Sequence, residues 1–180
     1  MAYTKRQLKQ QAQWDAMTEA ERRVEIAKDV KESIQAGEYG KIATNHYVYG
    51  CFESSGKMCP TRQDIQAIKQ SCSMCARGAL LISRVAKFNK LSFHDLSARN
   101  GKAWTDEEET TEGLKGAFTE RQLKSIEQAF EGWDSDGTRL EGVRDEDDPH
   151  VVFHNSHPNA EDRLLAIVQN IIDHDGDFKP

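Results

Sequence analysis

The sequence predicts a mainly α protein: one compact domain of five to six helices with two long acidic loops, and one short β hairpin or extended pair. Two observations predict this class. Apolar residues recur at three- and four-residue steps in several segments, which is the helical period, and strands do not alternate with helices. The 180 residues, 37% hydrophobic and 30% charged, suit a single domain with a modest core. We expect an N-terminal arm or short helix over residues 1–17 and the α-helical domain over residues 18–180.

The first helix of the domain is predicted between Thr18 and Gly37. Thr18 and Glu21 form a capping box, and glycine is a common helix stop. Between these two ends, apolar residues share one helical face: Val24, Ala27, Val30 and Ile34. Within residues 39–52, the aromatic and β-branched run from His46 to Tyr49 favours a short strand or an extended loop.

Two further helices are predicted in the middle of the chain. The first opens near Thr61 and Asp64 and continues through Ile65 and Ile68. The second runs from about Ser73 to Phe88, with an apolar stripe at Cys75, Ala79, Ile82 and Ala86. Residues 99–117 are polar, acidic and contain glycines, so they are predicted to form the first long loop.

The C-terminal part is predicted to contain two helices around the second long loop. Thr119 and Gln122 form another capping box, which opens a helix that ends at Gly132. Residues 133–150 are polar and rich in turn formers, so they are predicted to be a long surface loop. The last helix is predicted from about Asn159 to Ile172.

Charge is distributed unevenly along the chain. Residues 1–103 carry 17 Lys/Arg and 10 Asp/Glu, a net charge of +7, whereas residues 104–180 carry 7 and 20, a net charge of −13. The acidic half therefore presents a field that resembles that of a polyanion. No apolar run approaches the roughly 18 residues of a membrane span, and the N-terminal residues lack the apolar stretch of a signal peptide. We expect a cytoplasmic protein that does not contact a membrane.

The segment SCSMCARGALL, residues 71–81, contains two closely spaced thiols. Three interpretations apply: half of a zinc site, a redox pair, or a buried helix face. A zinc site requires four ligands, here Cys51, Cys59, Cys72 and Cys75, and the Cys51–Cys59 pair is more widely spaced than usual. A redox pair follows a strand, whereas a helical pattern precedes Cys72. We predict buried thiols on one helix face, beside small residues that let another helix approach, and no cofactor; zinc is the alternative.

Three histidines, His150, His154 and His157, form a second candidate metal cluster. Val151 to Phe153 favour an extended conformation, in which the three rings do not share one face, and Pro158 disfavours a helix at His157. A metal site would then need further ligands, such as Asp147 or His174. No phosphate-binding loop, nucleophile elbow or HExxH motif is present, and no order of Ser, His and Asp indicates a triad. The sequence therefore favours a protein that is not an enzyme.

Four blocks of sequence, taken together and in order, carry a resemblance to a known family. They are AERRVEIAKDVKESIQAG (20–37), CSMCARGALL (72–81), FTERQLKSIEQAFEG (118–132) and RLLAIVQNIIDHDGDFKP (163–180). This combination resembles a family of hypothetical proteins encoded by tailed bacteriophages. The likeness covers about two thirds of the chain, and it implies a context, the cytoplasm of an infected bacterial host, rather than a chemistry.

This context favours a protein that binds a host factor and inhibits it, plausibly as a counter-defence protein of the anti-CRISPR kind. Acidic side chains would contact the basic surface of a nucleic-acid-binding or defence-related host protein, and no direct contact with nucleic acid is expected. The candidate acidic residues are Asp106, Glu107, Glu108, Glu109, Asp145, Glu146, Asp147 and Asp148.

Two alternatives stay open. One is an oligomer that sequesters a nucleotide-like immune signal, with aromatic rings stacked on the base and arginines holding phosphate. Its candidate residues are Tyr47, Tyr49, Arg77, Arg84, Trp104, Trp133 and Arg163. The other alternative is a metal-dependent enzyme that uses His150, His154 and His157, or the cysteines.

Overall fold

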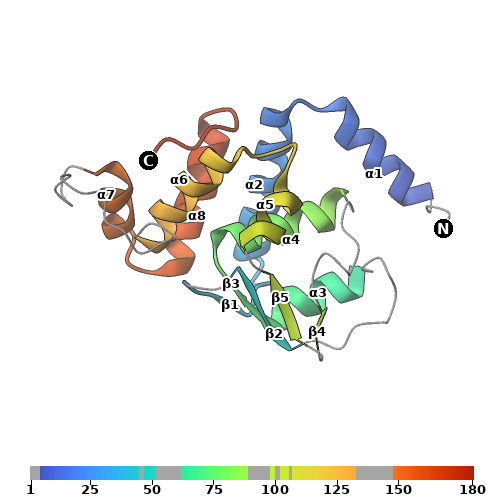
Figure 1. The fold of residues 1–180 in the computed structure, drawn as a ribbon, viewed down its shortest axis with the longest axis horizontal. Coiled ribbons are helices and arrows are strands. Elements are labelled where there is room, and N and C mark those ends of the chain that lie inside the picture. Colours follow the sequence, from blue (N-terminus) through green and yellow to red (C-terminus); the bar gives the residue numbers. More distant parts are fainter. Residues whose placement is uncertain are drawn as a thin grey trace.

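The structure is a computed structural model, which describes residues 5–44, 47–51, 62–88, 98–99, 102–105, 107–132 and 148–180. Within these ranges the protein is mainly helical, as predicted (Figure 1). The helices are α1 (Lys5–Ala16), α2 (Glu19–Gln35), α3 (Arg62–Ser71), α4 (Ala76–Phe88), α5 (Glu107–Leu114), α6 (Glu120–Glu131), α7 (Pro149–Ser156) and α8 (Ala160–Asp173). The strands are β1 (Lys41–Ile42), β2 (Val48–Cys51), β3 (Cys72–Met74), β4 (Ala98–Arg99) and β5 (Lys102–Thr105).

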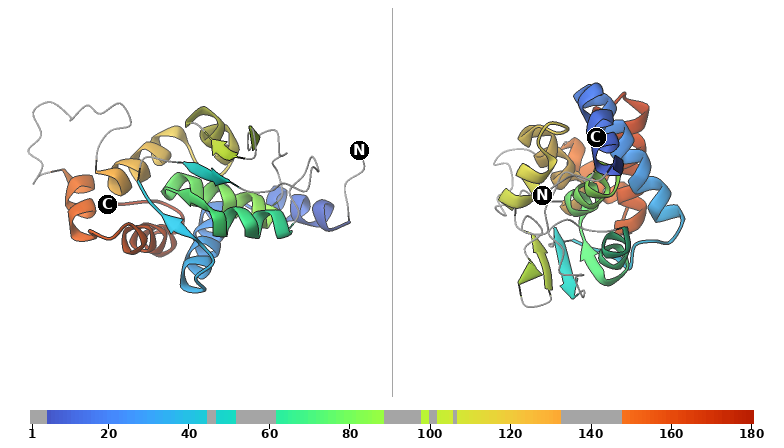
Figure 2. Two further views of the ribbon diagram at one scale, coloured as in Figure 1. Left: turned by 90° about the horizontal axis from the view of Figure 1, so that it is seen from below. Right: turned by 90° about the vertical axis from the view of Figure 1, so that its right-hand side faces the viewer.

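Helix α4 forms the centre of the core. It is buried at nearly every position, and helices α1, α2, α3, α5 and α6 all contact it. Helix α8 packs on α2 and α6, and α7 packs on α6. Helices α1 and α7 lie at opposite ends of the molecule, and the small sheet lies along one edge beside α3 (Figures 1 and 2). Among the described residues, no helix combines the length and apolar character needed to cross a bilayer.

Both predicted capping boxes are present and fix where α2 and α6 begin. The hydroxyl oxygen of Thr18 accepts the amide hydrogen of Glu21, and the Glu21 carboxylate accepts the amide hydrogen of Thr18. Thr119 and Gln122 make the same reciprocal pair at α6. Helix α6 ends at Gly132, whose φ of 81° lies in the left-handed region that favours glycine. Local sequence therefore sets the ends of these helices.

The strands form one sheet in the order β1-β3-β2-β5-β4, larger than the hairpin or extended pair that was predicted. Strand β3 pairs in parallel with β1 and antiparallel with β2, so it has a neighbour on both sides. The prediction of one helical face through Cys72 and Cys75 is therefore wrong, because Cys72 lies in β3 and α4 begins only at Ala76. Pairing with two distant strands overrides the local helical pattern.

The segment 99–117, predicted to be a loop, is largely ordered into β5 and α5. Strand β5 pairs antiparallel with β2, placing Trp104 opposite Tyr49. Helix α5 packs on α4 and buries Thr110 and Leu114. Among the described side chains of this segment, Leu114 and Ala117 are the buried hydrophobic ones, and the polar, acidic remainder conceals the helix from a search for hydrophobic periodicity.

Candidate functional site

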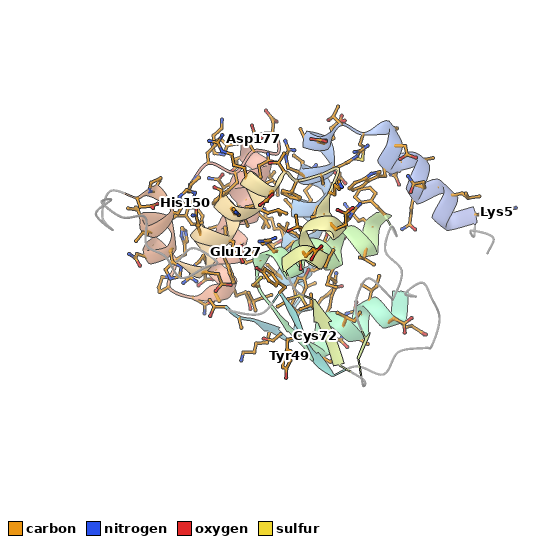
Figure 3. The ribbon with its side chains drawn as sticks, in the orientation of Figure 1. Lys5, Tyr49, Cys72, Glu127, His150 and Asp177 are labelled. Carbon is orange, nitrogen blue, oxygen red and sulfur yellow. The ribbon has the colours of Figure 1, made fainter. Side chains whose placement is uncertain are left out.

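A buried ion pair joins α4 to α6. Arg77 has no exposed surface, and its Nη1 lies 2.6 Å from Oε2 of Glu127. The Tyr47 hydroxyl donates to the other oxygen of the same carboxylate at 2.7 Å, and the Arg77 guanidinium also donates to the Thr111 hydroxyl and lies 5.0 Å from the Tyr47 ring. Figure 3 places Glu127 in the interior. Two candidate ligand-binding residues, Arg77 and Tyr47, therefore belong to a hydrogen-bond network inside the fold.

Arg163, the C-terminal candidate for holding phosphate, is also used internally. Its three guanidinium nitrogens donate to the backbone carbonyls of Phe130, His157 and Pro158, at distances of 2.6 to 3.2 Å. Burial lowers the pKa of Arg163 below its ordinary value. Carbonyl oxygens satisfy the donors of this buried cation, which thereby joins the start of α8 to the end of α6.

Arg84 lies in a different environment from Arg77 and Arg163. It is 6% exposed, and its guanidinium carbon lies 4.7 Å from the centre of the Trp14 ring. Arg22 lies against the same ring at 4.6 Å. Burial, and then the charge of Arg22, lower the pKa of Arg84 to about 10, while Glu112 acts in the opposite direction. Of the three candidate arginines, Arg84 is the one that is packed on an aromatic ring instead of bonded to oxygen acceptors.

The aromatic candidates are only partly described. Tyr49 is 41% exposed on β2, next to the Trp104 position of β5, while Tyr47 belongs to the network around Glu127. The side chain of Trp104 and the whole of Trp133 lie outside the described residues. The structure therefore places the backbones of Tyr49 and Trp104 opposite each other. The stacking of these aromatic rings on a base stays a prediction.

The side chains of Cys72 and Cys75 are both buried. Burial raises the pKa of Cys75 to about 12, although the amides of Gly78 and Arg77 hydrogen bond to the sulfur and act in the opposite direction. Cys51 lies in β2, one residue beyond Gly50, which pairs with Cys72. The side chain of Cys51 and all of Cys59 lie outside the described residues, so the four-cysteine zinc site stays a prediction.

The small residues after Cys75 do permit a close approach, but by a different element from the predicted helix. A Cβ atom at Gly78 would overlap the backbone carbonyl oxygen of Tyr47, at the start of β2. Ala76 and Ala79 are also fully enclosed. This close contact therefore joins α4 to the residue that precedes β2. Glycine is required at position 78 because its lack of a side chain makes room for the neighbouring backbone.

The histidine segment is a helix, not the extended segment that was predicted. Asp148 caps α7 by accepting the amide hydrogen of His150, and Pro149 occupies the first turn, where it needs no hydrogen-bond partner. The helix ends at Ser156, before His157 and Pro158, as the sequence predicts for a residue preceding proline. Capping and proline at the start of the helix outweigh the strand preference of Val151 to Phe153.

Each of the three histidines is hydrogen bonded within the protein. Nδ1 of His154 donates to the Phe130 carbonyl at 3.0 Å, and Nδ1 of His157 donates to the Phe153 carbonyl at 2.9 Å. Burial, with the charge of Arg163, lowers the pKa of His154. Within the described ranges, no group of three His, Cys, Asp or Glu side chains is placed to hold a metal ion.

His150 bridges α7 and α6 (Figure 3). Its Nδ1 lies 3.1 Å from Oδ1 of Asp148, and its Nε2 lies 2.8 Å from the Ser125 hydroxyl. This is the hydrogen-bond order of a nucleophilic triad, which the sequence did not indicate. An acyl-transfer site also requires donors for an oxyanion, and the same Asp148 oxygen is the cap of α7. We interpret the three residues as the contact that attaches α7 to α6.

The candidate acidic residues are dispersed. Glu107, Glu108 and Glu109 form the first turn of α5, where Glu108 is exposed, and the side chains of the other two lie outside the description. Asp148 is the α7 cap and is largely covered. Asp106 and residues 145–147 lie outside the described residues. The structure adds a set of acidic residues that was not predicted, at the first turns of α2 and α6 and at the C-terminus: Glu19, Glu120, Asp173, Asp175 and Asp177, all exposed.

This C-terminal acidic surface is held in place by Arg23. The guanidinium of Arg23 donates to the carbonyls of Gly176 and Ala117, at 2.6 and 2.8 Å, and lies 3.2 Å from the Asp177 carboxylate. Gly176 packs so closely on Ala20 that a Cβ atom there would lie 2.7 Å from the Ala20 carbonyl oxygen. The chain end is therefore fastened between α2 and α6, and Figure 3 shows Asp177 at the periphery.

Comparison with known proteins gives no relative. No family model matches the chain, and neither a curated protein nor a solved structure matches it.

Proposed function

We propose that the protein is a non-enzymatic binding protein whose acidic half contacts a basic surface on a partner protein. The observation that carries this proposal is the charge of the described C-terminal residues. Residues 107–132 and 148–180 carry 13 Asp/Glu and 5 Lys/Arg, a net charge of −8. Most of these acidic side chains are exposed, while Arg163 is buried and satisfied by carbonyls. A field of one sign on one part of a protein steers an oppositely charged partner.

The C-terminal acidic surface is the best-defined part of this region. Arg23 holds the backbone beneath it by hydrogen bonds to two carbonyl groups, so its carboxylates project from an ordered segment. Two of them, Glu19 and Glu120, lie in first helical turns, where a negative charge also favours the helix dipole. That helical role explains their presence in part, but it does not account for Asp173 and Asp175 at the opposite end of α8 from its N-cap.

The resemblance to phage-encoded proteins supplies the context of the proposal. We propose that the protein acts in the cytoplasm of an infected bacterium, where it occupies the basic groove of a nucleic-acid-binding host protein, such as a defence effector. By covering that groove, it would exclude the nucleic acid that the host protein normally binds. An inhibitor of this kind has no need of a catalytic residue or a cofactor.

Affinity purification from infected host cells, followed by mass spectrometry, tests this proposal. Three versions of the tagged protein are compared. One is the wild type, and one carries Glu120→Gln, Asp173→Asn and Asp175→Asn, which spares Asp177 because that residue pairs with Arg23. The third carries Glu32→Gln, Glu161→Gln and Asp162→Asn, a matched loss of three exposed charges outside the C-terminal acidic surface.

A specific partner should be captured by the wild type and by the matched control, and lost with the first variant. A fourth version, neutralised at 106–109 and 145–147, tests the acidic residues that the sequence indicated, except Asp148, which caps α7. Equal capture by all versions would exclude an electrostatic interface. Elemental analysis of the same eluate tests the alternative of a metal-dependent enzyme, and mass spectrometry of released small molecules tests the sequestering alternative.

A further inference from the structure

Five cationic side chains are buried in the described part of the chain: Arg23, Lys69, Arg77, Arg84 and Arg163. Four of them are neutralised or hydrogen bonded by oxygen atoms. Arg23 and Arg77 have both a carboxylate and other oxygen acceptors, Lys69 contacts Ser33 and Glu38, and Arg163 has three carbonyls. Arg84 is the exception, because the Trp14 ring is its contact and no oxygen acceptor in the described part of the chain lies within hydrogen-bond distance.

The same contrast exists within α4 itself. This helix carries three cationic residues and no acidic one. Arg77 is paired with Glu127 at 2.6 Å, and Lys87 is paired with Glu25 at 2.8 Å. Arg84 lies between these two positions in the sequence, and no carboxylate of the described residues forms an ion pair with it. A buried charge without a counter-charge is costly, so its presence requires an explanation such as a bound ion.

The Nε atom of Arg84 is enclosed without a hydrogen-bond partner. The two terminal nitrogens have no protein acceptor in the described residues, and the residue keeps 6% of its surface exposed. The Trp14 ring packs against the group at 4.7 Å, and Trp14 itself makes an edge contact with Phe88 at 4.8 Å. The donors of Arg84 are thus held in one orientation before any ligand arrives.

A second cation lies beside the first. Arg22 packs on the same Trp14 ring and donates from Nε to the Trp14 carbonyl and from Nη1 to the Gly116 carbonyl, which leaves Nη2 without a protein acceptor in the described residues. The negative charge of Glu112 on α5 raises the pKa of Arg84, but Glu112 is exposed and lies 3.2 Å from Lys115. Two like charges beside one ring repel each other, and an anion between or beside them removes that repulsion.

We propose that Arg84, with Arg22 beside it on Trp14, binds a small oxyanion, specifically a phosphate group, free or as part of a phosphorylated small molecule. The planar fork of an arginine matches the oxygen atoms of phosphate, and the aromatic ring behind it keeps the fork in place. This site belongs to the basic half of the chain, at the junction of α1, α2, α4 and α5. It does not rest on the proposed contact between the acidic half and a partner.

Thermal unfolding in low-salt buffer tests the site, with inorganic phosphate as the probe and sodium chloride of equal ionic strength as the reference. Phosphate should raise the Tm of the wild-type protein in a saturable way. Arg84→Met, which keeps an unbranched side chain against Trp14, should abolish the rise. Arg84→Lys, which keeps the charge without the fork, should weaken binding about tenfold or more. Arg121→Met removes an exposed arginine of α6 and should leave the rise unchanged.

The variants without phosphate give a second readout. Because Arg84 is unpaired, Arg84→Met should keep or raise the Tm of the ligand-free protein, whereas Arg163→Met should lower it. Trp14 fluorescence, measured in a background of Trp104→Phe and Trp133→Phe, should change on phosphate binding. The proposal is overturned by an unchanged wild-type Tm in phosphate, by an equal response of wild type and Arg84→Met, or by loss of folding in Arg84→Met. A response to citrate but not to phosphate would overturn the assignment of phosphate.

Discussion

Arg77 and Glu127 form an ion pair of 2.6 Å in which the arginine has no exposed surface. The pair joins the central helix α4 to α6 across 50 residues of sequence, and Tyr47 at the start of β2 donates to the same carboxylate. One carboxylate thus connects the helical core to the sheet. Such a pair is costly to break because the remaining charge stays buried.

Removing the charge of Glu127 should therefore destabilise the protein strongly. Glu127→Gln should lower the free energy of unfolding by about 3 kcal/mol, because Arg77 keeps its burial and loses its counter-charge. Tyr47→Phe should cost about 1 kcal/mol, the value of one hydrogen bond. Urea unfolding measures both changes. Glu112→Gln, at the exposed pair with Lys115, is the control and should cost less than about 1 kcal/mol. Similar losses for Glu112→Gln and Glu127→Gln would contradict this explanation.

Gly78→Ala should be much more harmful than Gly37→Ala. In an ordinary helix, alanine is more favourable than glycine by about 1 kcal/mol, but at Gly78 the new methyl group would overlap the Tyr47 carbonyl oxygen. A Cβ atom added at Gly37 would have no neighbouring atom within 4 Å, apart from adjacent residues of the chain. The penalty at this position comes from its φ of +64°, which favours glycine. Thermal unfolding of the two variants should show a large loss for Gly78→Ala and a small one for Gly37→Ala. The reverse order would show that α4 and β2 are not in close contact.

Stability should decrease at alkaline pH because of Cys75. Burial raises its pKa to about 12 in the folded protein, from an ordinary value of 9.0. Between these pH values the unfolded chain loses the thiol proton and the folded protein keeps it, so the free energy of unfolding falls by up to about 1.4 kcal/mol per pH unit. Cys75→Ala should reduce this slope. Tyr39, whose pKa is raised even further by burial, contributes in the same direction and remains in the variant.

His154 should make the attachment of α7 sensitive to acid. Burial and the positive charge of Arg163 lower its pKa in the folded protein, so the unfolded chain binds a proton more readily. The contribution of His154 to the free energy of unfolding is fully present above its ordinary pKa of 6.5. This contribution declines as the pH falls below that value. His154→Gln should reduce the difference in Tm between pH 7 and pH 5. A variant with an unchanged difference would show that His154 does not titrate on unfolding.

The helices that the sequence predicted well are those with local signals at their ends. Thr18 with Glu21, and Thr119 with Gln122, cap their helices within three residues, so no distant contact is required. Helix α7 was missed because its signals, Asp148 as cap and Pro149 in the first turn, stand inside a polar stretch that resembles a loop. A cap followed by proline was the signal that could have located it.

The sheet and the site residues depend on contacts that are distant in sequence. Cys72 to Met74 form a strand only because β1 and β2 lie on either side. Glu127 is not among the residues that the sequence indicated, and its partner Arg77 is 50 residues away. Trp14, in the segment predicted as an arm or short helix, is buried against two arginines. Pairings of this kind leave no periodic pattern in the sequence.

We propose that the C-terminal acidic surface of the protein recognises the partner protein by charge. The most direct test of this proposal is the association rate constant with the purified host partner, measured by stopped flow over a range of ionic strengths. The wild-type rate should fall steeply as salt increases, and the variant with Glu120→Gln, Asp173→Asn and Asp175→Asn should start lower and fall less steeply. The matched control at Glu32, Glu161 and Asp162 should follow the wild type. Identical salt dependence for all three proteins would contradict the claim.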